Sequence, residues 1–443
     1  MRRLPFVLFV LALPLTASAD DWPQWRGPER DGVWRETGIV KKLPAKLEPM
    51  WSTPIGLGYA GPAVVGDKVY VTDRQLAKDA ANPENPFDKT PVPGNERVLC
   101  LDGKTGEFLW KHEYPCRYRI SYPSGPRATP TIDGGKVYSL GAMGNFFCLD
   151  AESGKVLWSK DLLEDFGAEI NAWGYAAAPL IDGDNVILLV GGSDKRGVMA
   201  FNKETGEEVW GALEAVDPGY AAPMIFEAGG KRQLIVWDPY GLYALDPKTG
   251  DLFWEHKYNQ PLRYGMSIAT PIQNDAKDLL FVSAFYDGPL MMKLAANKPT
   301  AQMLWEGQSD SEINTDGLHA VMCTPVFKDN YLYGVGSYGA LRCLESESGK
   351  RIWESYKPTG KGRWWNAFIV PHEDRYFLSN EQGDLIIAKF SPKGYEEISR
   401  AFLIEPTNRA RRRKVVWSHP AYANKSVYSR NDEKILRVDL AEK

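Results

Sequence analysis

Short runs of alternating apolar and polar residues, separated by turns, occupy most of the chain. In the most frequent unit, a strand ends on an acidic or amide residue, two variable residues follow, then Thr or Ser and Gly, and a second strand reaches Trp. The side-chain oxygens of Asp, Asn, Thr and Ser bond to nearby backbone amides, and Gly adopts positive φ, so the centre of the unit is a tight turn. Each copy therefore predicts a β-hairpin.

This unit recurs along the chain. Five copies keep both the spacing and the Trp, a sixth carries a two-residue insertion, and a seventh, Ala388 to Ile398, lacks the Trp. Repetition of one hairpin over most of a chain is typical of a repeat architecture, in which each repeat buries its apolar face against the next. The tryptophans of the six copies are Trp110, Trp158, Trp210, Trp254, Trp305 and Trp353.

A second predicted hairpin precedes each copy. It begins at a Pro, continues through a polar turn and ends in an alternating apolar strand. Two hairpins make a four-stranded antiparallel unit, and Pro is tolerated on its innermost strand because the inner edge of that strand has no neighbour. An eighth unit begins at Asn366 to Val370, so the sequence predicts an all-β, eight-bladed β-propeller. The prolines that mark the other seven units are Pro62, Pro130, Pro179, Pro223, Pro271, Pro325 and Pro420.

The two ends of the predicted domain indicate how the ring closes. The last unit, Trp417 to Leu440, contains only three predicted strands, whereas Leu47 to Ile55 is an isolated strand that carries Trp51 in the outer-strand position. We expect this N-terminal strand to complete the last blade, because a shared sheet leaves no free edge at the junction. The predicted propeller domain is 47–443, and 20–46 is an N-terminal extension.

The first nineteen residues predict an export signal. Arg2 and Arg3 precede an apolar run from Phe6 to Leu15, and Ala17-Ser18-Ala19 is typical of a cleavage site. We expect cleavage after Ala19 and a periplasmic or secreted protein. No later stretch has about 18 uninterrupted apolar residues, so the sequence predicts no membrane-spanning helix.

The charge of the chain narrows the choice of partner. With 53 Lys and Arg against 57 Asp and Glu, the chain lacks the excess of positive charge that drives binding to phosphates. We therefore do not expect a nucleic acid to be the partner. The one basic run, Arg409 to Lys414, is interpreted as a solvated loop.

The five cysteines do not predict a disulfide. Cys100, Cys148 and Cys343 occupy one repeat position that is Ala in other copies, so they are interpreted as small core residues. Cys116 follows the first blade and Cys323 begins the sixth, which separates them across the ring. We expect a monomer with free thiols.

The repeat resembles the tryptophan-docking motif of the quinoprotein-type, pyrroloquinoline-quinone-like β-propellers. The resemblance covers the chain from about Trp51 onward, and the segment from Asp21 to Pro28, followed by Asp31-Gly32, is similar to the opening of exported members of that family. It implies that Trp51 and the six repeat tryptophans dock neighbouring blades on one another. The family includes quinone-dependent dehydrogenases and non-enzymatic scaffolds such as the outer-membrane assembly factor B, so the resemblance implies the fold more directly than the function.

Loops that join neighbouring blades meet at one mouth of the predicted channel. These loops share a face with the insertion Arg74 to Arg97, and the Thr-Gly turns lie on the opposite face. Aromatic, amide and cationic side chains just ahead of the inner strands suit a sugar, a quinone or a peptide, since such ligands need stacking surfaces and hydrogen-bond donors. The candidate ligand-binding residues are Tyr59, Arg127, Trp173, Tyr220, Tyr264, His319, Trp365, Asn366, Trp417 and His419.

No catalytic constellation is recognisable along the chain. None of the five histidines has a nucleophile or an acid at a recognisable spacing, and the nucleotide-binding and zinc-protease motifs are absent from the sequence. Enzymes of the resembling family have adjacent cysteines at the quinone and a calcium ion held by carboxylate and amide groups, and here no two cysteines are adjacent. Glu169 with Asn171, and Asp316 with Asn314, offer oxygen ligands to a hard cation, but ordinary loop solvation explains them as well.

The sequence favours an exported propeller that acts as a binding or scaffolding module through its loop-rich mouth. The expected partner is a protein or a glycan of unknown identity, and no cofactor is assigned. Two alternatives stay open. One is an oxidoreductase that depends on pyrroloquinoline quinone and calcium, with Arg127 and Asn366 as partners of the quinone carboxylates. The other is a carbohydrate-binding propeller that uses the same aromatic side chains.

Overall fold

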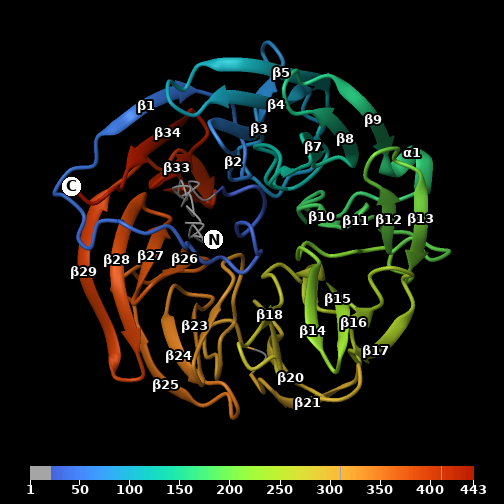
Figure 1. The fold of residues 1–443 in the computed structure, drawn as a ribbon, viewed down its shortest axis with the longest axis vertical. Coiled ribbons are helices and arrows are strands. Elements are labelled where there is room, and N and C mark those ends of the chain that lie inside the picture. The colour runs from blue at the N-terminus through green and yellow to red at the C-terminus, as the bar shows by residue number, and fades with distance from the viewer. Residues whose placement is uncertain (1–20, 310, 411) are drawn as a thin grey trace, which may run out of the picture.

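Every hairpin predicted from the repeat is present in the structure. The computed structural model describes residues 21–309, 311–410 and 412–443, and the predicted export signal, Met1 to Ala19, lies outside them. Within the described residues, eight four-stranded antiparallel sheets stand around a central axis (Figure 1). The prediction of an eight-bladed β-propeller is confirmed.

Each blade is a meander, and in blades 1 to 7 the first strand along the chain lies nearest the axis (Figure 1). The strands of blades 1 and 2 are β2 (Ala63–Val65), β3 (Lys68–Leu76), β4 (Gly94–Asp102), β5 (Phe108–Pro115), β6 (Thr131–Asp133), β7 (Lys136–Leu140), β8 (Asn145–Asp150) and β9 (Val156–Asp161). Those of blades 3 and 4 are β10 (Leu180–Asp182), β11 (Asn185–Leu189), β12 (Val198–Asn202), β13 (Glu208–Ala212), β14 (Met224–Ala228), β15 (Lys231–Asp238), β16 (Gly241–Leu245) and β17 (Leu252–Lys257).

The remaining blades follow the same order along the chain. The strands of blades 5 and 6 are β18 (Ile272–Gln273), β19 (Leu279–Ala284), β20 (Gly288–Leu294), β21 (Ala301–Glu306), β22 (Val326–Lys328), β23 (Tyr331–Val335), β24 (Leu341–Glu345) and β25 (Arg351–Ser355). Those of blades 7 and 8 are β26 (Ala367–His372), β27 (Arg375–Asn380), β28 (Asp384–Ser391), β29 (Gly394–Phe402), β32 (Ala421–Ala423), β33 (Ser426–Arg430), β34 (Lys434–Asp439) and β1 (Pro49–Pro54). Outside the blades lie a hairpin and two helical turns, β30 (Asn408–Ala410), β31 (Arg413–Val415), α1 (Leu162–Phe166) and η1 (Arg263–Gly265).

The N-terminal strand completes the last blade. Blade 8 has the order β1-β34-β33-β32, so its outermost strand comes from the start of the domain and the other three from its end. In this antiparallel ladder Trp51 lies opposite Arg437, and Thr53 lies opposite Ile435. The predicted closure is confirmed. Because both ends of the domain share one sheet, the ring opens only if this ladder breaks.

The structure moves two predicted boundaries. The seven marker prolines lie immediately before the innermost strands rather than inside them, where a missing N–H interrupts no ladder. The insertion is shorter than predicted, because β3 and β4 stay paired as far as Leu76 and Gly94, and the loop is 77–93. A buried ion pair supports this longer hairpin, with Arg97 Nε at 2.7 Å from Asp73 Oδ1.

The repeat tryptophans bridge neighbouring blades. In most blades the indole covers the Gly of the next blade's turn. A Cβ on Gly154, whose φ is +70°, would lie 2.4 Å from Trp110 Cε3, so both the backbone and the close approach of the indole require glycine. Trp254 differs because the next turn carries the insertion, and its Nε1 donates to Gln233 of its own blade at 2.7 Å. The other indoles donate to carbonyl oxygens of the next blade: Trp51 to Gly103, Trp110 to Ala151, Trp158 to Lys203, Trp210 to Pro247, Trp305 to Ser346 and Trp353 to Ser391.

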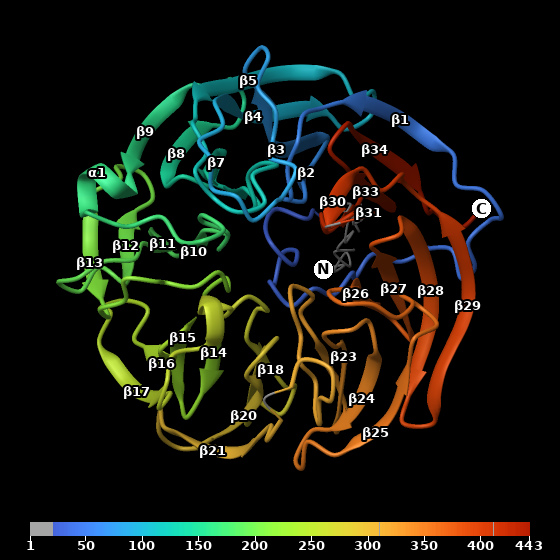
Figure 2. The ribbon, with the colours of Figure 1, turned by 180° about the vertical axis from the view of Figure 1, so that it is seen from behind.

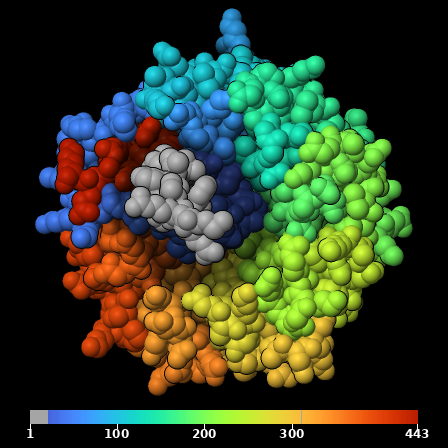
Figure 3. Space-filling view, in the orientation of Figure 1, coloured from blue at the N-terminus to red at the C-terminus, as the bar shows by residue number. Residues whose placement is uncertain are grey.

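The N-terminal extension runs across the centre of the ring, where Figures 1 and 3 show it in dark blue. We call residues 21–48 the N-terminal strap. Trp22 forms a β-bridge with Val64 of blade 1. Farther along, Arg30 donates to the carbonyl oxygens of Pro179 and Pro223, which precede the inner strands of blades 3 and 4. The strap then reaches blade 7, where the Trp34 amide donates to the Pro371 carbonyl at 2.9 Å. The sequence predicted only an extension, and the structure makes it the part of the chain that spans the channel.

Buried side chains of neighbouring blades form the core. All five cysteines are buried and unpaired. Cys100, Cys148 and Cys343 belong to clusters of apolar side chains between blades. Among the described residues, no helix has the length and hydropathy needed to cross a membrane.

Candidate functional site

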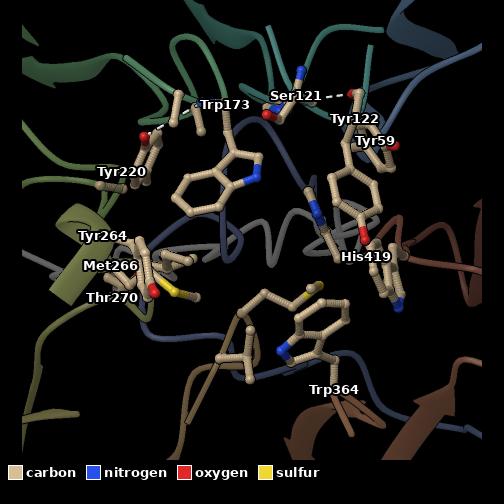
Figure 4. A pocket seen from close by; sticks show the side chains of 18 of the residues that line it. Tyr59, Ser121, Tyr122, Trp173, Tyr220, Tyr264, Met266, Thr270, Trp364 and His419 are labelled. Carbon is tan, nitrogen blue, oxygen red and sulfur yellow. Dashed lines mark hydrogen bonds between the residues drawn. The ribbon is translucent and has the colours of Figure 1, made fainter. Parts of the chain in front are cut away.

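A cavity of about 660 Å³ opens where the blade-to-blade loops meet. Tyr122, Trp173 and Trp364 point into it from three sides (Figure 4). Its wall is dominated by aromatic and small apolar side chains. This volume and this kind of wall are typical of a site that binds a ligand or an anchoring side chain of a partner.

Most of the candidate ligand-binding residues line this cavity. Each stands just ahead of an inner strand, or in the loop before it, where the chain enters a blade from the mouth. The structure brings together Tyr59, Arg127, Trp173, Tyr220, Tyr264, Trp417 and His419.

Three candidates lie elsewhere. His319 is fully buried behind the wall, with its Nδ1 at 3.2 Å from the carbonyl oxygen of Phe285. Trp364 has φ of +65°, which turns two consecutive indoles to different sides, so Trp364 lines the cavity and Trp365 packs on the glycine-rich loop before it. Asn366 is buried and its side-chain amide bonds inside the protein. The expectation that these three residues line the mouth is corrected accordingly.

Two further aromatic residues of the wall were not among the candidate residues. Trp25 belongs to the N-terminal strap, its Nε1 donates to Thr270 Oγ1 at 2.8 Å, and its ring lies 4.3 Å from that of His419. Phe87 belongs to the loop 77–93 and lies 6.1 Å from the Trp364 ring. The proline-rich insertion was expected at this face, but no local signal places Trp25 in the channel.

Several polar side chains of the wall are bonded within the protein. Arg127 donates to three backbone carbonyls between Ser121 and Gly125 at 2.6 to 3.0 Å. His419 Nε2 and Thr129 Oγ1 are 2.9 Å apart, and Thr270 already accepts from the strap. Few donors and acceptors therefore remain for a ligand, and the surface behaves as an apolar one.

The charges of the wall are all positive. Arg363 donates to Tyr286 Oη at 3.0 Å and to Glu312 at 2.5 Å, and its guanidinium lies 4.7 Å from the Trp364 ring centroid. Among the described residues, the lining includes this arginine and Arg127 but no carboxylate. The cavity therefore suits an apolar or aromatic group and disfavours a cation.

His419 is not a base at neutral pH. Burial lowers its pKa from 6.5 to about 3, because the surrounding rings and blade cannot solvate the imidazolium. The described lining contains no cysteine, carboxylate or second histidine that could act with it.

This pKa predicts an acid-sensitive fold. Because the folded protein holds His419 neutral, only the unfolded chain takes up this proton as the pH falls below 6.5. The free energy of unfolding should therefore fall by about 2 kcal/mol between pH 7 and pH 5 through this residue. In a His419→Gln variant that part of the decrease should be absent when denaturant unfolding is measured at both pH values. An equal decrease in both proteins would contradict the assignment.

The wall does not fit pyrroloquinoline quinone with calcium. A calcium ion prefers several carboxylate or carbonyl oxygens, and the described lining offers no carboxylate. Arg127, expected to bind a quinone carboxylate, is occupied by backbone carbonyls, and Asn366 lies outside the wall. None of the five cysteines lines the cavity.

The two candidate cation pairs also form other contacts. Asn171 donates to Asp217 Oδ1 at 2.7 Å. Asp316 accepts backbone amides from Gln308 and Gly317 at 2.6 and 2.8 Å. Within the described part of the chain, no three His, Cys, Asp or Glu side chains converge as they do around a metal. These contacts are those of ordinary loop structure.

Comparisons with known proteins identify relatives of two kinds. Residues 94–355 match the family model described as outer membrane protein assembly factor BamB. The protein of that name from Yersinia pestis is 24% identical over 282 residues, which cover 62% of this chain and 66% of the relative. Quinoprotein ethanol dehydrogenase from Pseudomonas putida is 31% identical over 194 residues, which cover 40% of this chain and 27% of the relative. The matched segments thus span less than two thirds of either relative.

Solved structures share the fold. BamB from Moraxella catarrhalis superposes with a TM-score of 0.58 at 15% identity, over 89% of this chain and 99% of that one. Quinohemoprotein alcohol dehydrogenase from Comamonas testosteroni superposes with a TM-score of 0.60 at 14% identity, over 96% of this chain and 81% of that one. At these identities the likeness concerns the fold alone, and the same propeller occurs in a protein assembly factor and in an enzyme.

Proposed function

Because the chain belongs to the family of the outer membrane protein assembly factor BamB, we propose that it is a non-catalytic scaffold that binds a partner polypeptide at the mouth of the propeller. Apolar side chains of the partner enter the aromatic cavity, and the rigid ring holds them in place. The protein acts outside the cytoplasm, as the export signal predicted from its first nineteen residues suggests.

One observation carries this proposal: an aromatic cavity whose arginine, histidine and threonine side chains are already bonded within the protein. Arg127 is bonded to carbonyl oxygens and His419 to Thr129, while Trp173 and Trp417 present ring surfaces to the cavity. Rigid aromatic walls gain free energy from burying apolar side chains, and such pockets at the centre of interfaces bind the anchoring residues of a partner.

The same observation argues against a carbohydrate ligand. A sugar brings several hydroxyl groups, and each one that leaves water without a new partner costs free energy. Aromatic faces alone do not supply those partners. A phenylalanine or leucine side chain has no hydroxyl group that needs a partner, so a polypeptide fits the wall better than a glycan does.

A labelled peptide tests the proposal. We expect a fluorescein-labelled dodecapeptide of Phe-Gly-Ser-Gly repeats to bind saturably, and a Trp173→Ala variant to bind it about 10- to 100-fold more weakly, because the indole forms one side of the cavity. Fluorescence anisotropy measures both affinities. An Ala-Gly-Ser-Gly peptide of the same length should not bind.

A matched control separates the cavity from general surface hydrophobicity. Phe108 is 51% exposed on the outer strand β5, away from the mouth, and Phe108→Ala should leave the affinity unchanged. Equal binding by Trp173→Ala and the unchanged protein would overturn the proposal. Calorimetric detection of tight, calcium-dependent binding of pyrroloquinoline quinone would replace it with the oxidoreductase alternative.

A further inference from the structure

A basic hairpin stands beside the cavity. It consists of β30 and β31, between blades 7 and 8, and lies close to the axis of the ring (Figure 2). At one end, Tyr59 Oη of the cavity wall donates to Asn408 Oδ1 at 3.4 Å. At the other end, Arg413 and Trp417 donate to the same carboxylate, Glu381, at 2.7 and 3.0 Å. The hairpin is thus fixed to two residues that line the cavity.

Three cations of this hairpin face solvent. Arg409, Arg412 and Lys414 are exposed, and within the described residues no carboxylate lies at ion-pair distance from them. The sequence indicated a solvated basic loop, and the structure adds its position at the rim of an aromatic cavity. None of the three lines the cavity itself, so their charge is available to the part of a ligand that extends from the cavity over the hairpin.

Positive charge continues into the wall and beneath it. Arg127 and Arg363 line the cavity. In the strap below, Arg26 and Arg30 are buried and bond to backbone carbonyls rather than to carboxylate oxygens. Burial lowers the pKa of Arg30 to about 9, which still leaves it charged at neutral pH. The chain as a whole has a net charge of −4, so this concentration of cations is local.

Carboxylates near these groups pair with a wall arginine or with Arg413 of the hairpin, and not with the exposed cations. Glu312 pairs with Arg363 at 2.5 Å, and Glu381 pairs with Arg413 at 2.7 Å. Asp432, behind the hairpin, accepts a backbone amide and a side-chain amide. The rim formed by the hairpin is left with an unbalanced positive charge.

Resting on the proposed scaffold function, we propose that the bound partner segment is acidic as well as aromatic. Its aromatic side chains occupy the cavity, and its Asp or Glu carboxylates pair with Arg409, Arg412 and Lys414 on the hairpin. Arginine binds carboxylates through two parallel hydrogen bonds, and a positive rim around an apolar centre selects a segment of opposite charge. An anionic polysaccharide has the same charge, but its hydroxyl groups would lack partners in the cavity.

Peptides of matched length test the charge preference. The probes are fluorescein-labelled repeats of Phe-Gly-Glu-Gly, Phe-Gly-Ser-Gly and Phe-Gly-Lys-Gly, titrated with the full mature protein. We expect the acidic peptide to bind about tenfold more tightly than the neutral one and the basic peptide more weakly than either. The difference should shrink at 0.5 M salt, because exposed charges are screened at that concentration.

Variants that remove positive charge test whether the preference for the acidic peptide comes from the hairpin. A triple variant Arg409→Ser, Arg412→Ser and Lys414→Ser should lose the preference for the acidic peptide and keep its affinity for the neutral one. The control removes three exposed lysines from Thr-Gly and Ser-Gly turns, which lie away from the mouth, with Lys155→Ser, Lys248→Ser and Lys350→Ser. It changes the net charge equally and should keep the preference. Thermal unfolding followed by circular dichroism confirms that both variants fold.

The outcomes separate this inference from the proposed function. If the acidic and neutral peptides bind equally, the charge preference is wrong and the scaffold function stands. If neither aromatic peptide binds, the scaffold function itself is wrong. Binding of polygalacturonate in place of the peptides would overturn both and indicate a glycan ligand. An equal loss of preference in the two triple variants would contradict the role of the hairpin.

Discussion

Replacing Trp34 by alanine is expected to lower the free energy of unfolding by about 3–5 kcal/mol. Trp34 is 1% exposed and packs against Tyr422, Phe377 and His372, with ring centroids 4.9 to 5.1 Å apart. Its Nε1 also donates to Glu36 at 2.9 Å. Alanine would leave a cavity between blades 7 and 8 and remove one of the donors to the buried Glu36 carboxylate, which the Lys425 amide also contacts. The cavity cannot close because the blades are held by their own ladders.

Guanidinium-induced unfolding followed by circular dichroism measures this loss. Thr37→Ala, an exposed position of the same strap, is the control and should change the free energy of unfolding by less than about 0.5 kcal/mol. A decrease of less than about 1 kcal/mol for Trp34→Ala would mean that the strap contributes little to the core.

Replacing Trp51 by alanine is expected to lower the free energy of unfolding by a similar amount, about 3–5 kcal/mol, at the contact between the last and first blades. Trp51 is 7% exposed on β1, the strand that closes blade 8, and its Nε1 donates to the Gly103 carbonyl of blade 1 at 2.9 Å. The indole also covers Gly106 in the same turn. Loss of the indole weakens both the closing strand and the contact between the last and first blades.

The neighbouring residue provides the control for this variant. Met50 is 55% exposed on the same strand, so Met50→Ala keeps the ladder and the strand and should be nearly neutral. Chemical denaturation measured as above compares the two. A similar loss in both variants would attribute the effect to β1 as a whole and contradict the specific role of the indole.

The fold could be predicted from the sequence because its signals are local. A turn of Asp, Thr and Gly forms within a few residues, and the alternation of apolar and polar residues along each strand indicates which of its faces is buried. Repetition then specifies the number of blades, and the missing strand at the end, with Trp51 on an isolated strand at the start, specifies the closure. Strand lengths were misjudged, as where Asp73 and Arg97 extend the first blade, and the hairpin of β30 and β31 was expected as a loop.

The candidate site could be predicted in part. Residues such as Tyr59 and Trp417 line the cavity because they precede inner strands, and the repeat in the sequence indicates where each inner strand begins. The repeat does not predict which of two adjacent side chains faces the cavity, because that depends on the backbone angle φ of a single residue. At Trp364 a φ of +65° reverses the expected choice and sends Trp365 to the other side.

The sequence by itself determined the repeat, the ring, its closing strand and the face on which the loops gather. Only the tertiary structure decided that the N-terminal strap crosses the channel, that Trp25 lines the cavity, and that the basic hairpin stands at its rim. The reason is physical: Trp34 meets Tyr422 and Arg30 meets Pro223 across long stretches of chain. Such contacts exist only after the ring has formed a surface for the strap to occupy, so no local pattern encodes them.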